Sequence, residues 1–156
     1  MVLYRTISLG RRQVKTDTGT HRASWRRISP EHSTGAGGCD YFVVDEYNHS
    51  VTGALKNALD QVYKEWIRKS FTAIGYGSVG GARAIEHLRA IGVELQMVST
   101  HATVHIGGSD FFSIHPMFGN KQITDIEANL LPSAKTARDE LAWGVRATMA
   151  AKATEG

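Results

Sequence analysis

Cysteine, proline and long apolar runs are all scarce in this sequence of 156 residues, which has one cysteine and three prolines. Because Cys39 has no second cysteine to pair with, no disulfide can form within the chain, and we expect a reducing, cytoplasmic setting. No stretch is long and apolar enough to suggest a membrane span, and residues 1–10 lack the apolar centre of a signal peptide. The length predicts one domain with its own hydrophobic core.

Charge is modest overall but unevenly distributed. The net charge is +3, yet residues 1–30 carry seven basic side chains against one acidic side chain, Asp17, which leaves −3 for the rest. A basic arm of this kind can bind nucleic acid or an anionic surface. No pattern of aromatic residues accompanies it, so a solvated or disordered terminus is the favoured interpretation. The glycines of Ser33–Cys39 precede a strand instead of following one, and we expect a flexible connector there.

The first strand–turn–helix unit lies in the middle of the chain. Tyr41–Val44 is an apolar run without alternation, which is typical of a strand buried on both faces. A polar corner, Asp45–Ser50, follows it, and we expect Asn48 or Ser50 to cap the next helix. The apolar positions that then recur at helical spacing, from Val51 to Trp66, predict one continuous amphipathic helix with an Asp60–Lys64 ion pair.

A second unit repeats this order. Phe71–Gly75 predicts another short strand, and it runs into a glycine-rich turn and a helix within Tyr76–Leu88. The apolar stripe of this helix is expected at Ile85, Leu88, Ile91 and Leu95. Glycines between a strand and a helix let backbone N–H groups approach a ligand closely, and the helix N-terminus adds partial positive charge.

The remaining chain predicts a strand within Gln96–Ile106, a loop at Gly107–Asn120, a short helical or irregular piece at Ile123–Leu130 and a terminal helix at Pro132–Ala151. The alternation of strands and helices predicts an α/β fold, with a parallel sheet covered by helices on both faces. We expect two parts: a poorly patterned basic segment at residues 1–39 and the α/β domain that carries these elements at residues 40–156.

Three stretches are similar to one known family. EYNHS at Glu46–Ser50, GALKNALD at Gly53–Asp60 and YGSVGGARAIEHLR at Tyr76–Arg89 resemble the NAD(P)H-dependent FMN reductases, flavodoxin-like proteins that include azoreductases and chromate or quinone reductases. The resemblance covers residues 40–106, and the C-terminal stretch Asp139–Met149 is compatible with it. It implies a five-stranded parallel sheet in a dimer or tetramer.

The resemblance also implies a site and a reaction. One side of the isoalloxazine ring of FMN would be wrapped by the first corner, formed by Glu46, Tyr47, Asn48, His49 and Ser50. The polar edge of the ring would meet backbone groups of the second corner, formed by Gly77, Ser78, Val79 and Gly80. NAD(P)H would reduce the bound FMN, which would then reduce a small acceptor. Because the cofactor carries this chemistry, we name no catalytic side chain.

Two features depart from the family pattern. Asp45 stands where the family usually has proline. Residues 1–40 show no Ser/Thr- and Arg-containing loop for the FMN phosphate, and Arg11 and Arg12 are only a weak counterpart of such a loop. We therefore expect the first strands of the family to be missing or replaced, with Tyr41–Val44 as an exposed sheet edge. A non-catalytic flavodoxin-like protein that has lost phosphate binding, and an anion- or nucleic-acid-binding module, are the alternative hypotheses.

Other reactive side chains offer weaker candidates. His101 and His105 are evenly spaced on an expected strand, but a third metal ligand is missing, so no metal site is predicted. Cys39 is expected to be a small apolar filler. Ser78 lacks the G-x-S-x-G spacing of a nucleophile and is interpreted as part of a ligand-binding turn.

Overall fold

The computed structural model describes residues 39–154 of the chain. Strands β1 (Cys39–Tyr47), β3 (Ser70–Tyr76), β4 (Val98–Ser99) and β5 (Val104–Ile106) run parallel, with β3 between β1 and the β4–β5 side. The short strand β2 (Ser50–Val51) pairs antiparallel with the end of β1. The sheet is thus parallel except at β2, and the predicted α/β fold class is confirmed. Residues 1–38, with the basic arm, the connector and Arg11–Arg12, lie outside the described residues.

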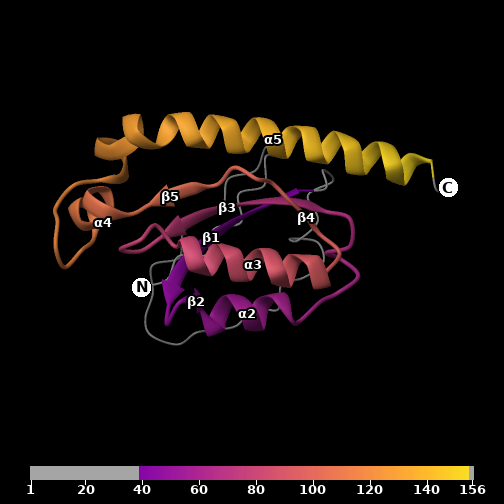
Figure 1. Cartoon of the computed structure of the whole chain (residues 1–156), viewed down its shortest axis with the longest axis horizontal. Coiled ribbons are helices and arrows are strands. Elements are labelled where there is room, and N and C mark those ends of the chain that lie inside the picture. The colour runs from indigo at the N-terminus through magenta and orange to yellow at the C-terminus, as the bar shows by residue number, and fades with distance from the viewer. Residues whose placement is uncertain (1–38, 155–156) are drawn as a thin grey trace, which may run out of the picture.

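The helices cover both faces of this sheet (Figure 1). α2 (Gly53–Leu59) and α3 (Ala82–Glu94) lie along one face, and α5 (Glu127–Ala153) lies along the other. A short helix, α4 (Gly108–Ile114), follows β5, and a 3₁₀ turn, η1 (Ile123–Ile126), leads into α5. None of the helices in the described range is long and apolar enough to cross a membrane.

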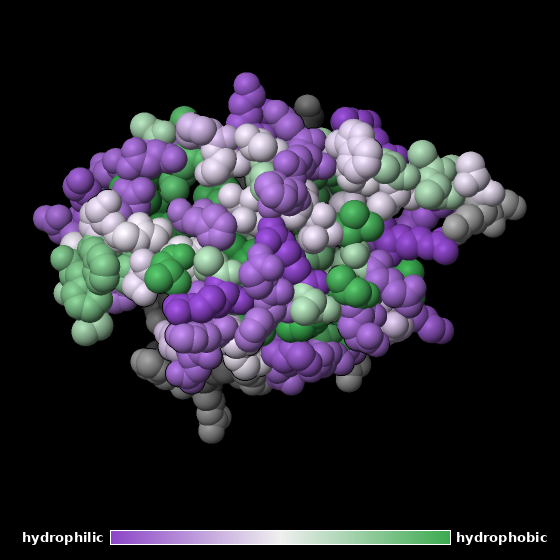
Figure 2. All heavy atoms as spheres, in the orientation of Figure 1, coloured by the Kyte–Doolittle hydropathy of each residue, from purple (hydrophilic) through white to green (hydrophobic). Residues whose placement is uncertain are grey.

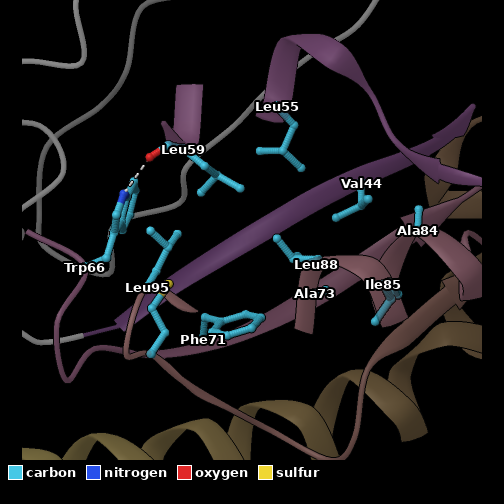
Figure 3. Close-up of a cluster of buried hydrophobic side chains, with 11 residues drawn as sticks. Val44, Leu55, Leu59, Trp66, Phe71, Ala73, Ala84, Ile85, Leu88 and Leu95 are labelled. Carbon is cyan, nitrogen blue, oxygen red and sulfur yellow. Dashed lines mark hydrogen bonds between the residues drawn. The ribbon is translucent and has the colours of Figure 1, made fainter. Parts of the chain in front are cut away.

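The main hydrophobic core lies between the sheet and the face of α2 and α3 (Figure 3). Ile85 and Leu88 are fully buried there and Leu95 nearly so, which confirms the apolar stripe predicted for α3. They pack with side chains of alternate strand residues, among them Val44, Phe71 and Ala73. On α5 only part of the expected stripe is buried, at Ala137, Leu141 and Gly144, whereas Trp143 and Met149 are exposed.

The first predicted helix is shorter than expected and begins with a different cap. The Thr52 side chain accepts a hydrogen bond from Leu55 N at 3.2 Å, so neither Asn48 nor Ser50 is the cap. α2 ends at Leu59, whose carbonyl accepts the indole N–H of Trp66 at 3.1 Å. This bond folds the chain back toward the helix, and the apolar residues of the sequence pattern are buried without one continuous helix (Figure 3).

The predicted Asp60–Lys64 pair is replaced. Asp60 pairs with Lys56 at 2.6 Å, one turn earlier in the chain. Because the helix ends at Leu59, Asp60 and Lys64 do not share a helical face.

The third predicted strand is interrupted. Between β4 and β5, side chains bind backbone groups that a continuous strand would pair: Ala102 N donates to Glu140 Oε2 at 2.7 Å, and Arg89 donates to His101 O at 2.7 Å. The expected loop at Gly107–Asn120 contains α4. The terminal helix begins at Glu127 and includes Pro132, so it starts five residues earlier than predicted.

Gly92 of α3 tests how tightly this core is packed. A Cβ on Gly92 would lie 2.7 Å and 2.8 Å from two ring carbons of Phe71. We predict that Gly92→Ala lowers the free energy of unfolding by about 1–3 kcal/mol, because the buried ring must shift. Gly53→Ala is the matched control, since a Cβ there meets nothing within 4 Å. Urea unfolding followed by circular dichroism measures both variants, and equal stability of the two would contradict the packing argument.

Candidate functional site

The candidate site lies at the carboxyl edge of the parallel strands, where ligands bind in open α/β sheets. β1 ends beside β3 there, with Asp45 opposite Tyr76, and β5 ends with Ile106 opposite the same tyrosine. The turn Gly77–Gly80 follows β3 directly. The structure thus places the two predicted corners next to each other, although they are about 30 residues apart in the sequence.

The first corner is a β-hairpin, not a strand-to-helix corner. β1 continues to Tyr47, and Asn48 and His49 form the turn to β2 with φ angles of 50° and 65°. Two consecutive left-handed residues are what a two-residue hairpin turn of type I′ requires. Tyr47, Asn48 and His49 are exposed, whereas the Ser50 hydroxyl lies 2.8 Å from Nδ1 of His87 on α3.

Glu46 connects this hairpin to α3. Its carboxylate accepts the backbone N–H of Arg83 at 3.1 Å and the Arg83 Nε–H at 2.6 Å, and it also forms an ion pair with Arg83 Nη2. Burial alone would raise the pKa of Glu46, but the hydrogen bonds and the charge of Arg83 outweigh it and lower the pKa. Glu46 therefore occupies the positive N-terminal end of α3, which sequence reasoning had left open for a ligand.

The second corner is held against the end of β5. Gly77 N donates to Ile106 O at 3.2 Å, and Gly108 N donates to Ser78 O at 3.0 Å. A Cβ on Gly107 would lie only 2.5 Å from Gly80 N, so the two backbones touch. Within residues 39–154, the N–H groups of Ser78 and Val79 have no hydrogen-bond partner. These two exposed residues give the turn a pair of available donors.

The opposite face of this edge carries aromatic residues that sequence reasoning did not connect. The Tyr76 ring lies 4.9 Å from that of Phe111, and His115 lies 5.0 Å from Phe111 and 4.8 Å from Phe118. Burial, and then the charge of Asp45, raise the pKa of Tyr76, while burial raises the pKa of Asp45 itself. Figure 2 shows apolar side chains gathered at the α4 end, where Met117 and Phe118 are 80% and 63% exposed. The signal in the sequence was the density of phenylalanine in Gly107–Asn120.

Two hollows are present, one away from the candidate edge and one that borders the first corner at Ser50. One of about 280 Å³ is at the amino end of β3, between Ser70, Thr100 and Trp143, and so lies away from the candidate edge. The other, of about 450 Å³, is lined by Ser50, Lys56 and His87. In the described part of the chain no three His, Cys, Asp or Glu side chains form a metal-ligand group. The Cys39 side chain lies outside what the structure describes.

The ion pair between Glu46 and Arg83 yields a pH-dependent prediction. We expect Glu46→Gln to lower the free energy of unfolding by roughly 1 kcal/mol at pH 7, because a charged acceptor is lost and Arg83 is partly exposed. The folded-state pKa of Glu46 is below the ordinary 4.5, so the carboxylate contributes this stability above that pH and loses it as pH falls through the lowered pKa.

The measurement is urea unfolding of the unsubstituted chain and of Glu46→Gln from pH 7 to pH 3. The difference between their free energies of unfolding should become smaller as the pH falls. Asp139→Asn is the control, because Asp139 pairs with Arg138 on the exposed surface of α5. A constant difference across this pH range would show that the charge of Glu46 is not responsible.

Comparison with known proteins agrees with the geometry of this edge. Residues 40–110 match the family model described as NADPH-dependent FMN reductase. An NAD(P)H-dependent FMN reductase of Nectria sp is 39% identical over 77 residues, which are 46% of this chain and 38% of that protein. An NAD(P)H:quinone oxidoreductase of Solanum tuberosum is 41% identical over 63 residues, 38% of this chain and 32% of that protein.

A third relative is the NAD(P)H-dependent FMN reductase LOT6 of Saccharomyces cerevisiae, which is 38% identical over 50 residues, 32% of this chain and 26% of that protein. The chain thus spans well under half the length of these relatives. The family name itself specifies FMN and NADPH as the cofactor and the reductant. The sheet edge, the hairpin and the glycine turn all fall within residues 40–110, the segment of the chain that is similar to the NADPH-dependent FMN reductase family.

Proposed function

We propose that this chain binds the isoalloxazine ring of FMN at the carboxyl edge of its sheet, in an NAD(P)H-dependent oxidoreductase that reduces a small acceptor. The observation that carries the proposal is a pair of N–H groups in the turn after β3, at Ser78 and Val79, which have no partner within residues 39–154. The polar edge of the ring carries carbonyl oxygens and ring nitrogens that accept hydrogen bonds. Two available donors on a fixed turn suit such an edge.

The exposed hairpin next to this turn supports the same placement. Glu46 ties the hairpin to α3, so Tyr47, Asn48 and His49 are held beside the glycine turn by a pair that is nearly buried on the glutamate side, where the side chain is 6% exposed. We propose that these residues cover one side of the ring and exclude water from it. Asp45 stands opposite Tyr76 on β3. Because Asp45 and Glu46 are consecutive in β1, their side chains lie on opposite faces of the sheet, and Asp45 is on the face away from α3.

In this proposal the protein contributes binding and orientation. When bound, FMN would supply the redox chemistry, which is hydride acceptance from NAD(P)H and electron transfer to the acceptor. Ser78 and Val79 would donate hydrogen bonds that orient the ring, and Glu46 holds the hairpin to the start of α3. A homodimer or homotetramer and a small-molecule acceptor stay predictions from the resemblance, and a cytoplasmic location stays a prediction from the single cysteine.

The FMN phosphate is a separate question. The N-terminus of α3 already holds the Glu46 carboxylate, so a phosphate there would meet a negative charge. We infer that residues 39–154 bind the ring more than the phosphate. The non-catalytic alternative is the case in which ring binding has been lost as well.

Binding of flavin tests the proposal. We expect saturating FMN to raise the unfolding temperature of the purified chain, since a ligand at about 100 times its Kd adds about 2.7 kcal/mol of stability. Flavin fluorescence in a titration gives the Kd. An unchanged unfolding temperature together with unaltered fluorescence would favour the non-catalytic alternative and reject the proposal.

Riboflavin is the matched ligand, because it has the ring without the phosphate. If ring contacts dominate, its Kd should lie within about tenfold of that of FMN, which corresponds to about 1.4 kcal/mol. A larger preference for FMN would place phosphate contacts in residues outside 39–154, with Arg11 and Arg12 as the first to substitute.

A further inference from the structure

His105 is the central residue of β5, and its side chain lies beside the glycine turn. Its Nδ1 is 2.9 Å from the carbonyl oxygen of Gly80, and its Nε2 is 2.8 Å from the Thr103 hydroxyl. Both ring nitrogens therefore have a partner: Nδ1 contacts the glycine turn, and Nε2 contacts the residue that immediately precedes β5. Sequence reasoning considered this histidine only as a metal ligand with His101.

The chemistry of the two partners determines the tautomer. A carbonyl oxygen can only accept, so Nδ1 must carry a proton and donate it to Gly80 O. In a neutral ring Nε2 is then the acceptor, and the Thr103 hydroxyl donates to it. Free neutral histidine prefers the opposite tautomer, with the proton on Nε2. The two hydrogen bonds therefore donate in the same direction, from Thr103 to His105 and from His105 to Gly80 O. The Nδ1–H tautomer of His105 is the feature by which this arrangement can be recognised.

This chain of hydrogen bonds acts on the most constrained residue of the turn. Gly80 is buried and has a φ of 69°, and a Cβ there would lie 2.8 Å from His105 Cβ. The imidazole therefore packs against Gly80 as well as binding its carbonyl. With the bonds from Gly77 N to Ile106 O and from Gly108 N to Ser78 O, it satisfies the inner polar groups of the turn. The N–H groups of Ser78 and Val79 are the ones that stay available.

We propose that His105, held as its Nδ1–H tautomer by Thr103, is the positioning residue that sets the Gly77–Gly80 turn for a planar, acceptor-rich ring ligand. The ligand class rests on the proposed function, whereas the tautomer and the order of the turn do not. His105 acts through Gly80 and has no assigned contact with the ligand.

The first test needs no flavin. In the chain labelled with ¹⁵N-histidine, two-bond ¹H–¹⁵N spectra at about pH 8.5, where an unperturbed imidazole is neutral, should show His105 protonated at Nδ1 and unprotonated at Nε2. In Thr103→Val, which keeps the shape but removes the hydroxyl donor, the signals should move toward the Nε2–H tautomer. An Nε2–H tautomer in the unsubstituted chain would overturn the proposal.

The second test compares two substitutions of the same residue. Asn can place an amide N–H near the position of Nδ1, whereas Phe keeps the ring shape without a donor. We expect His105→Phe to weaken FMN binding at least about tenfold and His105→Asn to stay within about threefold of the unsubstituted chain. His101→Phe is the control, because His101 is an exposed histidine at the opposite, amino-terminal end of β3.

Amide exchange of the turn is the readout that separates positioning from general stability. Without flavin, Gly80 N–H, which donates to Gly77 O at 2.9 Å, should exchange faster in His105→Phe than in His105→Asn, while core amides of β3 change equally. Equal exchange and equal FMN affinity in the two variants would overturn the proposal. If the unsubstituted chain binds no FMN, the proposed function fails, and the tautomer and exchange measurements still decide the role of His105.

Discussion

The backbone of the β3–α3 turn packs so closely against the end of β5 that neither Gly80 nor Gly107 has room for a Cβ, and the candidate site depends on this constraint. A methyl group on Gly107 would lie 2.5 Å from Gly80 N, and one on Gly80 would lie 2.8 Å from His105 Cβ. Such close backbone contact is possible because β3 and β5 are in parallel register up to Tyr76 and Ile106. The sheet therefore determines the position of the turn, and the strands hold the N–H groups of Ser78 and Val79 in place more firmly than a flexible loop would.

The pair formed by Glu46 and Arg83 fastens the other side of the site and changes its electrostatics. It joins residues that are 37 positions apart and thereby couples the β1–β2 hairpin to the start of α3. A helix N-terminus that is free attracts anions, but this one is compensated by a protein carboxylate. In the proposed function, flavin binding is therefore divided: the edge of the ring would find donors in the described residues, and the phosphate would be bound by other residues.

Local patterns in the sequence were sufficient for the fold class and for the two corners that the structure brings together. The helical spacing of Ile85 and Leu88 and the apolar run at Phe71–Gly75 each reflect burial against one neighbour, and both are where they were predicted. Features that depend on a distant partner were not predictable: α2 ends early because the Trp66 indole takes the Leu59 carbonyl, and Glu46 is engaged by Arg83. The hairpin was missed because Asn48 and His49 adopt left-handed conformations without glycine.

The central claim is that Ser78 and Val79 donate their backbone N–H groups to the flavin ring. Titration of the ¹⁵N-labelled chain with riboflavin, followed by amide chemical shifts, tests it most directly because the ligand lacks the phosphate. We predict the largest shifts at Ser78 and Val79, followed by those of the hairpin residues Asn48 and His49, with little change around the hollow beside Ser70 and Trp143. Shifts concentrated at that hollow, or none at Ser78 and Val79 when riboflavin is bound, would contradict it.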